Sequence, residues 1–196
     1  VKTEGTTTIT NCAREPEIED VANFLNRMGA KISGAGTKVI TITGVKTLKG
    51  CRYKVICDRI EAGTYLILGA ILNGVTLTNI NHNYLTSLIN LLRKSGFIIE
   101  TNKDKITLSK QDKIKPFNIK IGPYPAFPTD LGQPLSVLGT QIEGISVIQE
   151  TIFKKRYSHV EELNKMGAKI QVIDDNITIE GITELTNKNV MAHDLR

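Results

Sequence analysis

The sequence contains no tryptophan, and aromatic residues make up only 5% of its 196 residues. Surfaces that bind single-stranded nucleic acid usually stack bases on aromatic side chains. The lysine-rich stretch between residues 94 and 120 also carries Glu100, Asp104 and Asp112, so we interpret it as a solvated hairpin and loop. The formal charge of +5 still allows an anionic partner, either nucleic acid or a phosphorylated small molecule.

Cysteine is also scarce, and the three that occur, Cys12, Cys51 and Cys57, are not spaced like a metal site. We predict reduced thiols and no bound metal. Apolar runs are short as well: the longest, residues 65–72, is interrupted by Gly69 and cannot cross a bilayer. No signal-peptide core follows Val1. We therefore expect a cytoplasmic protein with no membrane partner.

One order of elements occurs three times along the chain: strand, helix, glycine turn, strand, strand. In the first copy, residues 6–11 alternate as a strand. A helix with a buried face follows, because its apolar residues have helical spacing. These residues are Val21, Phe24, Leu25 and Met28. Gly29 ends the helix, and two short strands follow, the second with Ile40 and Ile42 on one face.

The second copy covers residues 74–109 and the third starts at residue 146. Apolar residues at helical spacing predict the helix of the second copy. They are Leu85, Leu88, Ile89 and Leu92. In the third copy Val160 and Leu163 mark the helix, and Ile177 and Ile179 alternate in the last strand. Residues 28–30 and 166–168 are both Met-Gly-Ala, which predicts one turn used twice.

An aspartate stands in the connector after each copy: Asp58, Asp130 and Asp194. Aspartate is a strong helix N-cap, so each is expected at the start of a further helix. Stretches of small and apolar residues follow the first two, at 62–72 and 135–140. The third copy stops at Arg196, before its helix, and the first copy opens on a bare strand. Both ends therefore look like cuts, and we expect a piece of a longer protein.

Five ordered segments carry a resemblance to a known enzyme family. They are residues 11–17 (NCAREPE), 24–37 (FLNRMGAKISGAGT), 58–64 (DRIEAGT), 124–130 (YPAFPTD) and 190–196 (VMAHDLR). Together they resemble UDP-N-acetylglucosamine 1-carboxyvinyltransferase, over essentially the whole chain. The resemblance implies an α/β fold of six βαβαββ repeats in an inside-out barrel, with about three present. Residues 1–56 would be the last repeat of the first domain, and 57–196 most of a truncated second domain.

The resemblance also implies a reaction. The family transfers the enolpyruvyl group of phosphoenolpyruvate to the 3-hydroxyl of UDP-N-acetylglucosamine, releases phosphate, and so commits precursors to peptidoglycan. It uses no cofactor. Asp130 matches the aspartate that binds the sugar hydroxyl and is proposed as the base, and Asp194 matches one that handles protons. Four further residues match substrate contacts or their neighbours: Thr129, Ile152, Arg156 and Arg196. A structural role is expected for His159.

The family's acid is a cysteine on a mobile loop upstream of the segment that matches Val1, and none of the three cysteines matches it. We therefore expect the isolated chain to be inactive, and to need the remainder of the enzyme to complete its active site. Two alternatives stay open: a fragment of a 3-phosphoshikimate 1-carboxyvinyltransferase, and a non-catalytic nucleotide- or RNA-binding module of the same fold. The interleaved acids and few aromatics disfavour the last, so no nucleic-acid partner is expected.

Overall fold

The computed structural model describes residues 1–109 and 113–192. The chain forms two compact units, Val1–Cys57 and Asp58–Arg196. This division falls one residue from the boundary expected after residue 56. The assignment of the units to the first and second domains of a larger enzyme stays a prediction.

The first unit contains one helix on a three-stranded sheet. Its elements are β1 (Thr6–Thr10), α1 (Pro16–Arg27), β2 (Lys31–Ser33) and β3 (Val39–Thr43). The strand order is β1-β3-β2, and β3 pairs antiparallel with both neighbours. Pro16 lies in the first turn of α1, with Glu17 and Glu19 beside it, where acids favour the positive end of the helix.

The predicted buried face of α1 is wrong in part. Ala22 is buried and Leu25 half-buried, whereas Val21 is 55% and Phe24 38% exposed. A narrow three-stranded sheet covers only one stripe of a helix, so a second apolar stripe next to it stays at the surface. Phe24 is covered in part by Tyr53, whose ring centroid lies 5.3 Å away.

The second unit carries two further sheets. The segment with the first sheet contains α2 (Arg59–Ile71), β4 (Gly74–Thr78), the 3-10 turn η1 (His82–Leu85), α3 (Thr86–Ser95), β5 (Ile98–Asn102) and β6 (Lys105–Ser109). The segment with the second sheet contains β7 (Asn118–Lys120), the 3-10 turn η2 (Thr129–Leu131), α4 (Gly132–Gly139), β8 (Gly144–Gln149), α5 (Ser158–Lys165), β9 (Lys169–Ile173) and β10 (Asn176–Gly181). The strand orders are β4-β6-β5 and β7-β8-β10-β9.

The second sheet completes the predicted βαβαββ repeat. β7 pairs parallel with β8, so α4 serves as the crossover that parallel neighbours require, while β10 pairs antiparallel with β8 and β9. The segment from α2 to β6 has the same order of elements, except that no strand is described at its start. The predicted residues of α3 and β6 are buried as expected: Leu85, Leu88, Ile89, Leu92, Ile106 and Leu108.

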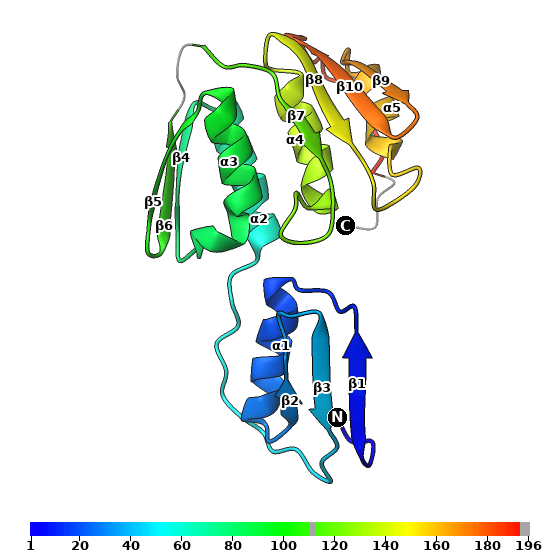
Figure 1. Cartoon of the computed structure of the whole chain (residues 1–196). Coiled ribbons are helices and arrows are strands. Elements are labelled where there is room, and N and C mark those ends of the chain that lie inside the picture. Colours follow the sequence, from blue (N-terminus) through cyan, green and yellow to red (C-terminus); the bar gives the residue numbers. More distant parts are fainter. Residues whose placement is uncertain (110–112, 193–196) are drawn as a thin grey trace. The chain divides into compact units, whose positions relative to one another are not determined.

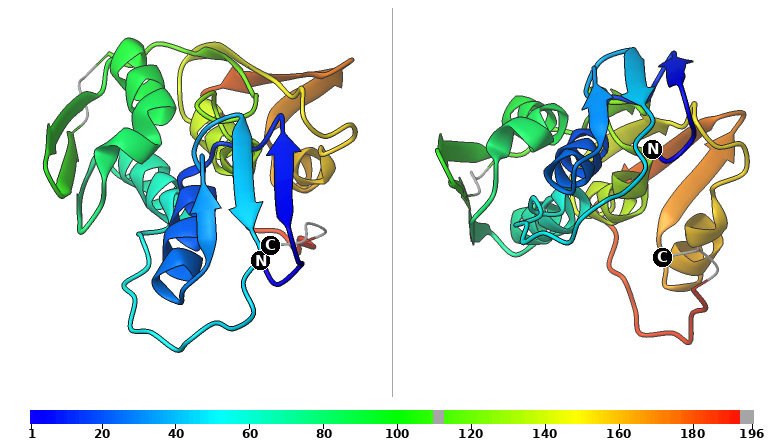
Figure 2. Two further views of the ribbon diagram at one scale, coloured as in Figure 1. Left: turned by 60° about the horizontal axis from the view of Figure 1, so that its bottom comes forward. Right: turned by 90° about the horizontal axis from the view of Figure 1, so that it is seen from below.

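Helices α2 and α4 pack against each other between the two sheets of the second unit, as Figure 1 shows. Figure 2 shows the same arrangement from two other sides. Leu66, Leu131 and Leu135 are fully buried at this contact. Two glycines of α2 let the neighbours approach: a β-carbon at Gly63 would lie 2.6 Å from Leu131 Cδ1, and one at Gly69 would overlap the side chain of Val75.

Gly69→Ala is therefore expected to destabilise the second unit by about 1–2 kcal/mol. The overlap with Val75 must be relieved by shifts in a packed core, which outweigh the better helix propensity of alanine. Urea unfolding measures the effect. Gly50→Ala is the control, because a β-carbon at Gly50 meets no atom within 4 Å. Equal midpoints for the two variants would contradict this packing.

The Met-Gly-Ala turn is indeed used twice. Gly29 and Gly167 have φ of +103° and +105°, a left-handed conformation that glycine adopts without strain. Three residues before each glycine, Asn26 and Asn164 donate to the carbonyls of Ile32 and Ile170 and accept from the amides of the same residues, at 2.8–3.1 Å. In the copy between them Arg93 holds the carbonyl of Ile99 at 2.7 Å and Gly96 is left-handed.

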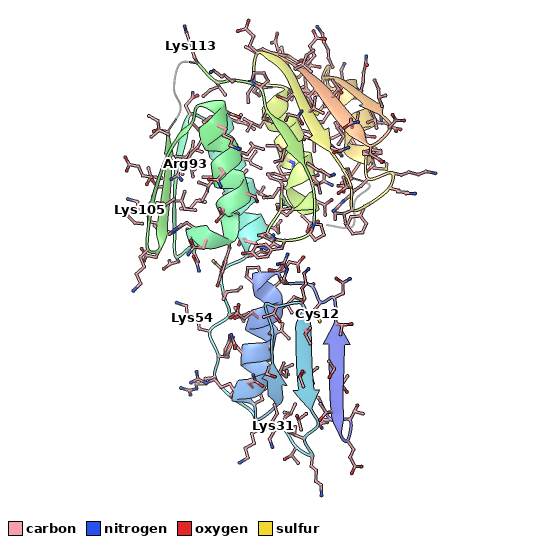
Figure 3. All side chains as sticks on the ribbon, in the orientation of Figure 1. Cys12, Lys31, Lys54, Arg93, Lys105 and Lys113 are labelled. Carbon is pink, nitrogen blue, oxygen red and sulfur yellow. The ribbon has the colours of Figure 1, made fainter. Side chains whose placement is uncertain are left out.

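The lysine-rich stretch carries exposed side chains in its described part. Lys103, Lys105, Lys113 and Lys115 are all exposed, and Figure 3 labels Lys105 and Lys113 on the hairpin strand β6 and the connector after it. Lys110 and Asp112 lie outside the described residues. The exposure agrees with the interpretation of a solvated hairpin.

Candidate active site around Asp130 and Arg156

Asp58 and Asp130 occupy matching connectors but make different contacts. Asp58 is the N-cap of α2, and its Oδ1 accepts from the amides of Ile60 and Glu61 at 2.7 and 3.1 Å. Asp130 instead lies inside the turn η2, and the residues at the adjoining N-cap positions, Pro128 and Leu131, make no side-chain cap hydrogen bond. The cap role expected for Asp58 is confirmed. Asp130 lies at the start of a helical segment, as expected, but it is not the N-cap residue.

Asp58→Ala is expected to lower the free energy of unfolding by about 1 kcal/mol, and Asp58→Asn by only a few tenths. Asparagine accepts the same amide hydrogen bonds, and alanine cannot. Urea unfolding of the two variants measures the difference. Equal losses in both would indicate that the charge of Asp58, and not its capping oxygen, stabilises α2.

Asp130 forms a close cluster with Arg156 and Thr129. Arg156 Nη1 lies 2.9 Å from Asp130 Oδ1 and donates to Thr129 Oγ1 at 3.1 Å. The side chains of Arg156 and Asp130 are 19% and 22% exposed, so the pair is sheltered but open on one side. The structure thus brings together three of the residues proposed from sequence: Thr129 and Asp130 are adjacent in the chain, and Arg156 lies 27 positions after Thr129.

A buried carboxylate that sequence reasoning missed completes the cluster. Glu150, just after β8, is only 4% exposed. Its Oε2 accepts the Thr129 hydroxyl at 2.6 Å, and its Oε1 accepts the amides of Ile152 and Phe153 at 2.7 and 3.2 Å. An acid directly after an alternating strand was the signal available in the sequence, since such a residue continues the inward face.

A cavity of about 380 Å³ opens beside this cluster within the second unit. Its polar lining comes from Asp130, Gln133, Arg156, Ser158, His159 and Glu162. Apolar walls come from Pro134, Leu163, Met166, Val190 and Met191. The cavity therefore combines a carboxylate and a guanidinium with apolar surface, the composition expected of a small-molecule site.

His159 contacts Ser136, which is fully buried on α4, with 3.1 Å between Nε2 and Oγ. Ile152 is 38% exposed. Its backbone amide donates to Glu150, which also accepts the Thr129 hydroxyl. The adjacent Phe153 ring lies 5.5 Å from the Arg156 guanidinium carbon. A solvent-facing turn thus lies beside the cluster.

Tyr157 follows Arg156 and donates to Asp175 Oδ1 at 3.2 Å. Burial, this hydrogen bond, and the negative charges of Asp175 and Glu150 raise the pKa of the Tyr157 hydroxyl above its ordinary value. Through its hydrogen bond to Asp175, the Tyr157 hydroxyl anchors the end of the 151–157 turn.

Asp194 and Arg196 lie outside the described residues, so the structure does not place them. Among residues 1–109 and 113–192, no group of three or more metal-binding side chains occurs. The three cysteines are free and half-buried. None of the helices in the described part of the chain is long and apolar enough to cross a membrane.

Residues 1–196 match the family described as EPSP synthase (3-phosphoshikimate 1-carboxyvinyltransferase), and the chain belongs to this family of enolpyruvyl transferases. The curated relatives that the chain resembles are named for one particular enolpyruvyl transfer reaction. It is 48% identical over 194 residues to UDP-N-acetylglucosamine 1-carboxyvinyltransferase of Clostridium botulinum, and 49% identical over 196 residues to UDP-N-acetylglucosamine 1-carboxyvinyltransferase 2 of Streptococcus pyogenes. The alignments cover 98% and 100% of this chain but 46% and 47% of those proteins. The chain spans about half the length of the curated relatives it matches.

Two solved structures support the fold. The enolpyruvyl transferase NikO from Streptomyces tendae aligns with a TM-score of 0.81 at 24% identity, over 92% of this chain and 44% of that one. EPSP synthase from Acinetobacter baumannii aligns with a TM-score of 0.52 at 17% identity, over 95% and 44%. The predicted α/β enolpyruvyl transferase fold is confirmed.

Proposed function

We propose that this chain carries the sugar-nucleotide side of an enolpyruvyl transferase that uses phosphoenolpyruvate and UDP-N-acetylglucosamine. The observation that carries the proposal is the Asp130–Arg156 pair at 2.9 Å, on the wall of the cavity. The names of the relatives, at about half identity over the whole chain, favour UDP-N-acetylglucosamine over a phosphorylated carbocycle as acceptor. The proposed setting is the cytoplasm and the first step of peptidoglycan synthesis.

In this reaction the 3-hydroxyl oxygen adds to C2 of phosphoenolpyruvate while the methylene carbon takes up a proton. Loss of a methyl proton and of phosphate then gives the enol ether. Asp130 is the proposed acceptor of the hydroxyl proton, held in place by Arg156. Ile152 and Thr129 are proposed sugar-nucleotide contacts, Asp194 a proton carrier, and Arg196 a cation for phosphoenolpyruvate.

The proton donor to the methylene carbon is not among these residues. Cys12, Cys51 and Cys57 are half-buried and all lie in the first unit, remote in sequence from Asp130. We propose that the isolated chain binds the sugar nucleotide but does not turn over, and that the missing remainder of the enzyme supplies the acid.

Two measurements test the proposal. Calorimetric titration is expected to give saturable binding of UDP-N-acetylglucosamine, weakened about tenfold or more in Asp130→Asn, and no binding of single-stranded RNA. Phosphate release is expected to stay at background with both substrates present. Release that needs both substrates and disappears in Asp130→Asn would overturn the predicted inactivity. Binding of RNA without the sugar nucleotide would favour the non-catalytic alternative.

A further inference from the structure

Glu150 is one of two carboxylates that are more than nine-tenths buried in the described residues, the other being Glu162. Burial of a carboxylate is costly unless donors satisfy it. Glu150 accepts from three: the Thr129 hydroxyl and the amides of Ile152 and Phe153. One side chain therefore joins the turn that carries Asp130 to the turn that carries Arg156.

The backbone around Glu150 is itself anchored. Its amide donates to the carbonyl of Asp175 at 2.8 Å, and the hydroxyl of Thr151 donates to the carbonyl of Ile121 at 2.6 Å. The carboxylate thus projects from the fixed end of β8, between β7 and β10 in the sheet. It is a rigid reference point for groups on the two turns.

The direction of each hydrogen bond matters here. Because the Thr129 proton points to Glu150, the hydroxyl oxygen presents its lone pairs to Arg156 Nη1. Nη1 carries two protons, and it lies 3.1 Å from Thr129 Oγ1 and 2.9 Å from Asp130 Oδ1. By accepting from Thr129, Glu150 therefore directs the lone pairs of one acceptor that Arg156 uses beside Asp130.

We propose that Glu150 is a positioning residue of this site, acting through Thr129 on Arg156 and Asp130, and setting the affinity for the sugar nucleotide. This inference rests on the proposed function. Glu150 touches no substrate in this scheme: its effect is to polarise one hydroxyl and to hold the turn of Ile152 and Phe153.

Glu150→Gln separates positioning from packing. Its amide oxygen can still accept from Ile152 and Phe153, so the amide nitrogen must face Thr129 and donate to it. The threonine proton is then redirected, and Arg156 loses an oriented acceptor. Thr129→Val removes the hydroxyl at nearly constant shape. Ser146→Ala is the control: Ser146 is fully buried on the same strand, where it accepts the amide of Phe117 at 3.3 Å, and is bound to none of the site residues.

Affinity for UDP-N-acetylglucosamine is measured by calorimetry for the parent chain, Glu150→Gln, Thr129→Val and the double variant that combines both changes. Each single variant is expected to lose about tenfold, and the double variant also about tenfold, because both changes break one chain of contacts. Ser146→Ala is expected to remain within about twofold. If the two changes acted independently, the double variant would lose about a hundredfold in affinity. That result, or no loss of affinity in Glu150→Gln, overturns the proposal.

A second readout needs no ligand. The side-chain nitrogen signals of Arg156 in ¹H–¹⁵N spectra are expected to be well dispersed in the parent chain and in Ser146→Ala, and to average in both Glu150→Gln and Thr129→Val. An unchanged Arg156 signal in Glu150→Gln overturns the positioning role. If the parent chain fails to bind the sugar nucleotide but these spectra change as expected, the proposed function fails and the positioning of Arg156 by Glu150 stands.

Discussion

Leu131→Ala is expected to lower the free energy of unfolding of the second unit by about 3–5 kcal/mol, the largest effect on stability that we predict. Leu131 is fully buried, and its δ-carbons fill the space left by Gly63 on α2. Truncation leaves a cavity between two helices that pack against sheets on either side. Because this packing limits the movement of the helices, they cannot close the cavity. The loss is measured by urea unfolding.

Leu72→Ala is the matched control for this experiment. Leu72 caps the end of α2 and is 66% exposed, so its truncation is expected to change stability by less than about 0.5 kcal/mol. Similar losses in the two variants would mean that α2 and α4 do not form the core. Leu131 also directly follows Asp130, so Leu131→Ala should weaken ligand binding as well.

Arg156→Ala is expected to reduce the affinity for UDP-N-acetylglucosamine about 30-fold or more, the largest effect on the proposed function. The change removes the hydrogen bonds to Asp130 and Thr129 and leaves a sheltered carboxylate beside the cavity without this cation. Arg156→Lys keeps the charge but not the planar fork, so a loss of about tenfold is expected. Calorimetry measures both.

Arg93→Ala provides the control, because Arg93 lies on α3 (Figure 3) and binds the backbone carbonyl of Ile99. Its affinity is expected to stay within about twofold of the parent chain. If Arg156→Ala also stays within twofold, the Asp130–Arg156 pair has no part in binding the sugar nucleotide.

Much of the fold could be predicted from local pattern. Helical spacing of Leu85, Leu88 and Leu92 identified α3 and its buried face, and alternation of Ile106 and Leu108 identified β6. The glycine turns were predictable because Gly29 and Gly167 need a left-handed φ that few other residues adopt. The same reasoning failed at Val21 and Phe24, since spacing shows that a stripe is apolar but not whether a neighbour covers it.

The candidate site was predictable in part. Asp130, Thr129 and Arg156 were identified from ordered motifs that resemble a family, and the structure places them within hydrogen-bonding distance, although their roles stay predictions. Glu150 was missed, because the alternation of β8 indicates only that position 150 faces inward, and does not show which donors would satisfy a carboxylate there. Its burial and its three donors exist only after β8 has entered the sheet.

By itself the sequence determined the repeated order of strands and helices, the glycine turns, the cap at Asp58 and the family. The elements, turns and cap depend on interactions between residues close in the chain, which a local pattern records, whereas the family is indicated by the ordered sequence motifs. Only the tertiary structure decided that Asp130 pairs with Arg156, and which carboxylate joins the turns that carry these two residues. Such contacts join residues 20 or more positions apart, and their partners are chosen by how helices and sheets pack.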